Sequence, residues 1–236
     1  ENDLGAGLDA RFGVWKSPVL KLTQFDAVTE EGVAVVTARY EMPQVKGVLT
    51  MTYRINGAGE VSVAEQLEAG DAEAPGMFRF GMTMAMPARY SEIVYYGRGA
   101  HENYCDRLSS ADLGLYSQKV ADQYHDEYVR PQESGTKSDL RWWSVVDSSG
   151  SGLVILSEAP FSASALPYAT EALDVTNFPP QQHSGPLRSG DRTYVNFDLR
   201  QMGLGCINSW GELPEDQYMI PYGDYTFRFL LRPTVK

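Results

Sequence analysis

The sequence predicts an all-β protein, built most simply as a large antiparallel sandwich of two sheets. Three observations lead to this fold class. Apolar and polar residues alternate with period two in several short runs, such as Gly47–Ile55 and Glu60–Leu67. Short polar turns rich in Gly, Asn, Asp and Pro separate the runs. No segment has the 3.6-residue apolar periodicity of a core helix.

The first half of the chain predicts an antiparallel meander. Between Pro18 and Met86, four successive β-rich runs are joined by short polar turns, and Asn56-Gly57 is a strong hairpin signal between two of them. A further strand is predicted next, directly before a glycine-rich segment. The five predicted strands are Val33–Tyr40, Gly47–Ile55, Glu60–Leu67, Met77–Met86 and Ser91–Tyr96.

The stretch 108–138 has no clean period of either kind, so the sequence predicts a long loop there. A loop of this length in a compact domain is usually functional or docks on another surface. Strands resume after it, with a short helix predicted at Pro167–Leu173 and an edge strand at Phe161–Ala165. The remaining predicted strands are Arg141–Val146, Gly152–Leu156, Thr193–Leu199 and Asp224–Leu231. Residues 1–236 are predicted to form a single β-sandwich domain.

Charge and hydropathy exclude several partner classes. The net charge is -11, from 31 acidic and 20 basic residues, and no run of Lys or Arg is present. Nucleic acid and anionic membrane surfaces are therefore not expected as partners. No apolar run reaches the roughly 18 residues of a membrane span. The chain starts at Glu1 without an initiator Met, so we expect a piece of a longer or processed protein.

The residues that could hold a metal or act as nucleophiles are sparse. Cys105 and Cys206 are far apart and favour two buried free thiols over a disulfide. The three histidines lack metal-ligand spacing, and each is expected to be structural; they are His101, His125 and His183. No Gly-x-Ser-x-Gly elbow is present. No metal site is predicted in this chain.

Carboxylates are more numerous, but the sequence pairs no two of them. Glycoside hydrolysis needs two carboxyl groups placed across one bond. Five acidic residues lie near aromatic or glycine motifs, and solvated or ion-paired side chains are the expectation for each of them: Glu102, Asp106, Glu133, Asp139 and Asp198.

The segment Glu102-Asn103-Tyr104-Cys105-Asp106-Arg107 is denser in hydrogen-bonding groups than a surface loop needs. Arg107 or Arg98 could clamp Glu102 or Asp106. The segment therefore predicts a polar cluster that fixes the long loop, with a surface for a partner domain or ligand as the alternative.

The tryptophans fall into two groups. Trp142 and Trp143 are neighbours on a strand and must point to opposite faces, so one of them is expected in the core. Trp15 could be core or a cap near the amino terminus. Trp210 follows a glycine-rich loop beside Asn208, Ser209 and Gly211, which cannot bury an indole. An exposed, ligand-facing ring that stacks on a sugar is the hypothesis for Trp210.

Four collinear motifs give the chain a family resemblance that covers nearly its whole length. It resembles the carboxy-terminal small-chain domain of bacterial β-galactosidases of glycoside hydrolase family 2, and Asn2-Asp-Leu-Gly5 is similar to the start of that domain. The motifs are Gly97-Arg-Gly-Ala-His-Glu-Asn-Tyr-Cys-Asp-Arg107, Gly114-Leu-Tyr116, Tyr128-Val-Arg-Pro-Gln-Glu-Ser-Gly135, and Gln201-Met-Gly-Leu-Gly205 followed by Asn208-Ser-Trp210-Gly211.

The resemblance implies an antiparallel supersandwich similar to galactose mutarotases. It also implies that the catalytic glutamates, and any Mg or Na cofactor, lie on a separate TIM-barrel domain of a homo-oligomeric parent. This chain would then hold no catalytic residue and be inactive alone. Trp210, with Asn208, would contact the galactoside substrate, and the segment Glu102 to Arg107 would serve as a structural or domain-interface motif. The compartment, bacterial cytoplasm or periplasm, stays open.

Two departures from the family pattern bear on substrate preference. The family commonly has Gly-Gly-Asp where Gly205-Cys206-Ile207 stands, and Pro where Ala100 and Cys105 stand. Two other function classes also stay open. One is a stand-alone carbohydrate-binding module, and the other is an aldose epimerase, which needs a His acid and a carboxylate base in one groove.

Overall fold

The structure is a computed structural model that describes residues 7–70, 73–174, 183–185, 187–208 and 210–235, and all structural statements below concern these residues. The chain forms two compact units. Unit 1 takes Glu1–Gly81, Ile155–Glu158 and Leu199–Pro233, and unit 2 takes Met82–Val154, Ala159–Asp198 and Thr234–Lys236. That residues 1–236 together make one β-sandwich domain stays a prediction.

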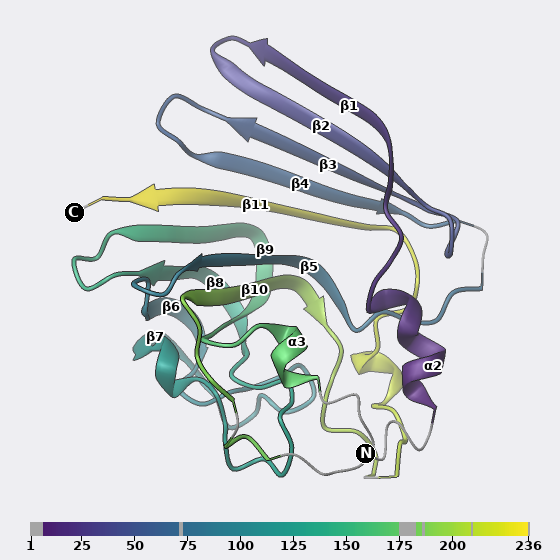
Figure 1. Cartoon of the computed structure of the whole chain (residues 1–236), viewed down its shortest axis with the longest axis vertical. Helices are drawn as coiled ribbons and strands as arrows, with labels where there is room; N and C mark the ends of the chain where they lie inside the picture. The colour runs from purple at the N-terminus through teal and green to yellow at the C-terminus, as the bar shows by residue number, and fades with distance from the viewer. Residues whose placement is uncertain (1–6, 71–72, 175–182, 186, 209, 236) are drawn as a thin grey trace. The chain divides into compact units, whose positions relative to one another are not determined.

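Unit 1 is organised around an antiparallel sheet whose strands follow the order β1-β2-β3-β4-β11. The first four strands form a meander, and the last strand of the chain pairs with β4 (Figure 1). The strands are β1 (Lys21–Glu30), β2 (Val33–Met42), β3 (Gly47–Ile55), β4 (Val61–Glu68) and β11 (Tyr225–Thr234). Short helical segments flank them: α2 (Leu8–Phe12), η1 (Gly13–Trp15) and η3 (Asp216–Tyr218).

Unit 2 is also built from strands. The order β9-β8-β6-β7 makes one part, and β10 pairs antiparallel with β9 and also pairs with β5. The strands are β5 (Arg79–Pro87), β6 (Glu92–Gly99), β7 (Asp112–Lys119), β8 (Lys137–Val146), β9 (Gly152–Leu166) and β10 (Arg192–Gln201). Two short helical segments connect them, η2 (Val120–Asp122) and α3 (Thr170–Leu173).

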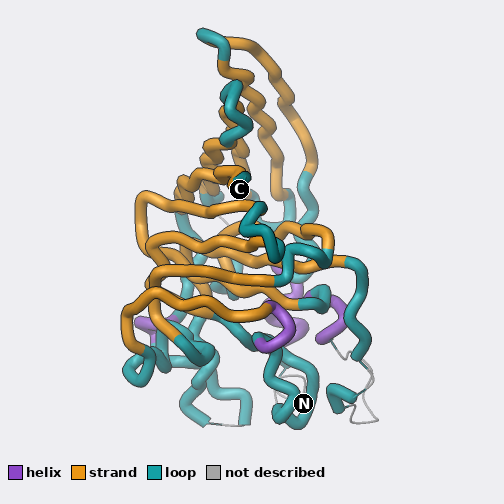
Figure 2. Tube along the Cα trace, turned by 90° about the vertical axis from the view of Figure 1, so that its left-hand side faces the viewer, coloured by secondary structure: helices purple, strands orange, loops and turns teal. Residues whose placement is uncertain are grey.

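The predicted fold class is confirmed, because strands, orange in Figure 2, dominate the regular structure and the pairings with a defined register are antiparallel. The hairpin at Asn56-Gly57 joins β3 to β4, with the Asn56 side-chain oxygen accepting the N–H groups of Ala58 and Glu60, each at 3.0 Å. The short helix predicted at Pro167–Leu173 is confirmed as α3. None of the helices among the described residues is long and apolar enough to cross a membrane.

Four details of the predicted topology are wrong. The meander does not continue into the run Met77–Met86, because β5 pairs with β10. Strand β1 was not predicted as a separate element, and β7 lies inside the stretch predicted as loop, because its glycine and tyrosine break the alternation. The two strands predicted at Gly152–Leu156 and Phe161–Ala165 are one continuous strand, β9.

The core of unit 2 explains the paired tryptophans. The ring of Trp143 is fully buried and stacks on Tyr95 at 5.0 Å, and Tyr95 stacks in turn on Tyr116 at 5.3 Å. Trp142 faces the other side of β8, is only partly buried and pairs with Tyr96 of β6. The prediction that one of the two indoles is core is therefore confirmed. In unit 1, Trp15 is half-buried and donates from Nε1 to the Pro75 carbonyl at 3.0 Å.

We expect these neighbouring indoles to differ sharply in their contribution to stability. Trp143→Ala should lower the free energy of unfolding by about 3–5 kcal/mol, because it leaves a cavity in a ring stack. Trp142→Ala should cost about 1 kcal/mol or less, because its site is partly solvated. Urea denaturation followed by circular dichroism measures both, and equal losses would contradict the assigned faces.

Candidate functional site

The first candidate site lies in unit 2, in the loop between β6 and β7. The buried side chain of Asn103 anchors this loop, with Nδ2 donating to the carbonyls of Arg98 at 3.2 Å and His101 at 3.0 Å. Its Oδ1 accepts the N–H of Ser138 at 3.0 Å, and its own N–H donates to the Thr136 carbonyl at 2.9 Å. One side chain thus ties the loop to the start of β8.

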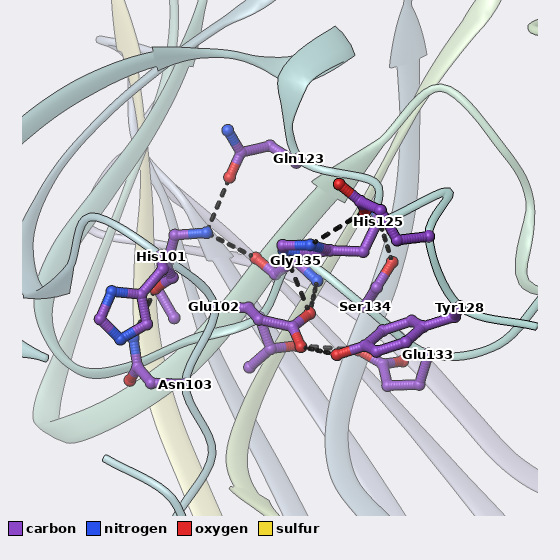
Figure 3. A network of polar contacts seen from close by, with 12 residues as sticks. His101, Glu102, Asn103, Gln123, His125, Tyr128, Glu133, Ser134 and Gly135 are labelled. Carbon is purple, nitrogen blue, oxygen red and sulfur yellow. Dashed lines mark hydrogen bonds and ion pairs between the residues drawn. The ribbon is translucent and has the colours of Figure 1, made fainter. Parts of the chain in front are cut away.

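The neighbouring Glu102 carboxylate is buried and surrounded by donors (Figure 3). Oε1 accepts hydrogen bonds from the Arg107 guanidinium and the Tyr128 hydroxyl. Oε2 accepts the Gly135 N–H at 2.8 Å and lies 3.6 Å from Nε2 of His125. We call these five residues the Glu102 cluster. Three of its members come from the segment 120–136, so the carboxylate joins two loop segments.

Gly135 is required by the geometry of this cluster. Its φ is +80°, a conformation that side chains rarely adopt, and a Cβ there would lie 2.5 Å from the Gln123 carbonyl oxygen. Only glycine can bring its backbone N–H to Glu102 at this point without moving the segment that carries Gln123.

The electrostatics of the cluster keep Glu102 ionised. Burial by itself raises the pKa of this carboxyl, but the hydrogen bonds from Tyr128 and the Gly135 N–H, with the charges of His125 and Arg107, outweigh it and lower the pKa below its usual value. Burial and the bond to Glu102 raise the pKa of the Tyr128 hydroxyl, so it stays a donor.

A buried lysine lies directly behind the cluster. Nζ of Lys137 donates to Gln123 Oε1 at 2.8 Å and to the Gly135 carbonyl at 3.0 Å. Burial lowers the pKa of Lys137 to about 8, although the negative charge of Glu102 opposes this shift. Neither Lys137 nor His125 was singled out for this site in the sequence, because both are contributed by segments without a clear pattern. The Tyr128-to-Gly135 motif was the available signal.

Within the motif Glu102 to Arg107, only the first and last residues belong to the Glu102 cluster as defined above. Tyr104 is buried, and the Arg107 guanidinium lies 4.9 Å from its ring centroid. Asp106 is partly buried. Arg98 pairs with Asp139 at 2.6 Å, and Arg107 forms the predicted clamp on Glu102.

The chemistry open to this cluster is limited. Both oxygens of Glu102 are held by donors, and its lowered pKa makes it a weak base. His125 and Glu102 do bring an imidazole next to a carboxylate, as an epimerase requires, but the carboxylate is not free to take a proton from a sugar. The cluster fixes loops, as the structural interpretation predicts, and its role in a domain interface stays a prediction.

The second candidate site, in unit 1, is the loop after β10 that carries Trp210. Hydrogen bonds from Met202 N–H to the Phe78 carbonyl at 2.9 Å and from Gly203 N–H to the Tyr218 carbonyl at 3.0 Å hold its base. Beyond this base the side chains are exposed, with Ile207 at 63% and Trp210 at 82%. The predicted exposure of Trp210 is confirmed.

Asn208 shapes this loop locally. Its Oδ1 accepts the Trp210 N–H at 2.8 Å, a turn that fixes the backbone beneath the indole. Cys206 has a φ of +50°, which suits the glycine that the resembling family commonly carries there. Ser209 lies outside the described residues, as does the Asn2-to-Gly5 motif. Substrate contact by Trp210 and Asn208 stays a prediction.

The cysteine prediction is half wrong. Cys105 and Cys206 form no disulfide within the described part of the chain, but both are exposed where burial was predicted, because each sits on a loop away from the sheets. Among the described residues, no three His, Cys, Asp or Glu side chains form a group that could hold a metal ion.

Comparison with known proteins places these sites in context. The family model described as β-galactosidase small chain matches residues 1–231. The chain is 30% identical to a β-galactosidase of Priestia megaterium over 237 residues and 30% identical to one of Streptococcus thermophilus over 239 residues. Each alignment covers 99% of this chain but 22% of the relative, so the chain spans about a fifth of their length.

Among solved structures, a GalM/aldose epimerase homologue from C. elegans aligns with a TM-score of 0.37 and 7% identity. That alignment covers 90% of this chain and 69% of the other.

We expect the stability of the chain to depend on the charge of Glu102. Because the folded pKa of this carboxyl is lowered, its contribution is fully present above its usual value of 4.5 and is lost as the pH falls through the folded pKa. Glu102→Gln should lower the free energy of unfolding at pH 7 by about 2–3 kcal/mol and flatten the acid side of the stability profile. Urea denaturation at several pH values between about 3 and 7 measures both.

Glu127→Gln is the matched control. Glu127 lies 3.7 Å from His125 Nδ1, but its side chain is mostly solvated, so its loss should cost about 0.5 kcal/mol or less. An acid profile of Glu102→Gln that parallels the unmodified chain would contradict the role given to the Glu102 charge.

Proposed function

Because this chain belongs to the β-galactosidase small-chain family, we propose that it is the non-catalytic carboxy-terminal domain of an enzyme that hydrolyses terminal non-reducing β-D-galactose residues. The match of the family model over residues 1–231 is the observation that carries this proposal. The relatives named β-galactosidase are several times longer than the chain, which leaves ample length for a separate catalytic domain.

The parent enzyme would use the retaining mechanism of glycoside hydrolase family 2. One carboxyl acts as acid and base and the other as nucleophile, about 5–5.5 Å apart. Both would lie on a TIM-barrel domain, with any Mg or Na ion, in a homo-oligomer. The state of Glu102 supports a non-catalytic role here, since a carboxylate with every oxygen bonded to the protein cannot attack a sugar.

Trp210 would complete the rim of the active site by stacking on the galactoside. Its support is the exposed indole at the tip of a loop whose base is held by backbone hydrogen bonds and whose turn is fixed by Asn208. A ring presented in this way offers a flat apolar face to the C–H side of a sugar at little cost in conformational entropy.

We expect the isolated chain to be inactive. Purified residues 1–236 should not hydrolyse a nitrophenyl β-galactoside above the uncatalysed rate, because the chain lacks the catalytic pair. Absorbance at the nitrophenolate band measures this. Turnover that disappears in Glu102→Gln or Asp198→Asn would contradict the proposal, whereas turnover that persists in both would indicate a contaminating enzyme.

We expect Trp210 to act on binding in the full enzyme. Trp210→Ala should raise KM about fivefold, since loss of one stacking ring is worth about 1 kcal/mol. Trp210→Phe should recover most of the loss, and Leu115→Ala, another exposed apolar side chain, should change nothing. Steady-state kinetics give the values, and an unchanged KM in Trp210→Ala would remove Trp210 from the site.

A further inference from the structure

One face of the β1–β3 sheet in unit 1 carries only uncharged residues. A bulge in β1 is part of the reason: Leu22 pairs with Tyr40 and Gln24 with Arg39, so Thr23 is an extra residue. The bulge places Leu22 and Phe25 on the same face although they are three residues apart. The residues of this face, which we call the apolar β1 face, are Leu22, Phe25, Ala27, Thr29, Ala34, Val36, Ala38, Tyr40, Leu49, Met51, Tyr53 and Ile55.

The charged side chains of β1–β3 all lie on the opposite face. There they form ion pairs across strands, at 3.4 Å for Lys21 with Glu41 and 3.3 Å for Arg54 with Glu30. Arg39 also reaches Glu68 of β4 at 3.5 Å. An antiparallel sheet with one charged and one apolar face normally covers the apolar face.

Cover of the apolar β1 face is incomplete. One row of cross-strand partners runs from Phe227 of β11 through Glu65 of β4, Met51 of β3 and Ala38 of β2 to Phe25 of β1. The first four of these residues are buried, whereas Phe25 is 61% exposed. Leu22 and Ile55 are exposed on the same face, and Val19 and Leu20 are exposed just before β1. The face is therefore continuous with the core and uncovered at its outer edge.

We propose that the apolar β1 face is the surface on which another part of the parent chain, outside residues 1–236, packs. This inference rests on the proposed function, in which the chain is one domain of a longer enzyme. The relatives supply the length: the chain spans 22% of them, so most of such a protein lies elsewhere. The chemistry fits an uncharged apolar surface, because β1–β3 place aliphatic and aromatic side chains and no charge on this face. The carboxyl of Glu65 on the neighbouring strand β4 is buried and therefore not part of the exposed edge.

A second copy of this chain is a poorer occupant. Each copy carries a net charge of -11, so two copies repel each other. Pairing of two β1 edges is also opposed by the bulge and by Lys21, Asp26 and Glu30 along the strand, which are features that hinder edge-to-edge association.

Hydroxyl-radical footprinting tests the proposal directly. Oxidation of Phe25 should fall about fivefold in the full parent enzyme relative to the isolated chain, because an interface core removes most of its exposure. Val28 lies on the opposite face of the same strand and is 52% exposed, so its oxidation should stay the same. Equal oxidation of Phe25 in both proteins would overturn the proposal.

Two variants separate packing from folding. In the parent enzyme, Phe25→Asp should lower Tm and restore oxidation at Leu22, whereas Val28→Asp should change neither quantity. In the isolated chain, both substitutions should leave Tm unchanged. A Tm loss of equal size for Phe25→Asp in both proteins would overturn the proposal. If oxidation of Phe25 instead falls as the concentration of the isolated chain rises, the face binds a second copy of this chain, and the proposal is overturned. These readouts do not involve Trp210 or turnover, so they can fail while the proposed function stands.

Discussion

A buried carboxylate needs hydrogen-bond donors around it. In unit 2, this requirement determines how the loop after β6 and the segment 120–136 lie against each other. Glu102 takes its donors from Arg107 in its own loop and from Tyr128 and Gly135 in the segment 120–136, with His125 nearby. Removing a charge from water costs several kcal/mol unless such partners are in place. The observed course of the long segment brings these donors to Glu102.

The same requirement explains the residues around the cluster. Gly135 is needed because its N–H must reach the carboxylate where a Cβ would collide with Gln123. Lys137 is tolerated in the interior because Gln123 and the Gly135 carbonyl accept from it, although burial still lowers its pKa. A cluster so fully bonded holds a surface in shape, which agrees with the proposal of a domain that supports an active site located elsewhere.

In unit 1, two places carry apolar side chains without cover, in contrast to the buried Glu102 carboxylate of unit 2, which has partners. The Trp210 loop and the apolar β1 face both expose large apolar side chains that unit 1 itself does not cover. Exposed apolar area of this kind marks a surface that meets something. A sugar suits a single flat indole on a fixed turn, and a protein surface suits a face that spreads over three strands. The two features thus fit different partners within one enzyme.

The sequence by itself determined the strands that alternate cleanly, such as β3 and β4 with their Asn56-Gly57 turn, because a period of two and a turn signal are local properties. It also determined the exposure of Trp210, since the neighbours Asn208 and Gly211 cannot bury a ring, and its motifs carried the family. Only the tertiary structure decided that β5 leaves the meander for β10, that β7 forms within the apparent loop, that His125 lies beside Glu102, and that Lys137 is buried against Gln123. Those contacts link residues that are distant in the sequence. They are stabilised by burial and by charge compensation, and neither effect can be recognised in a local sequence pattern.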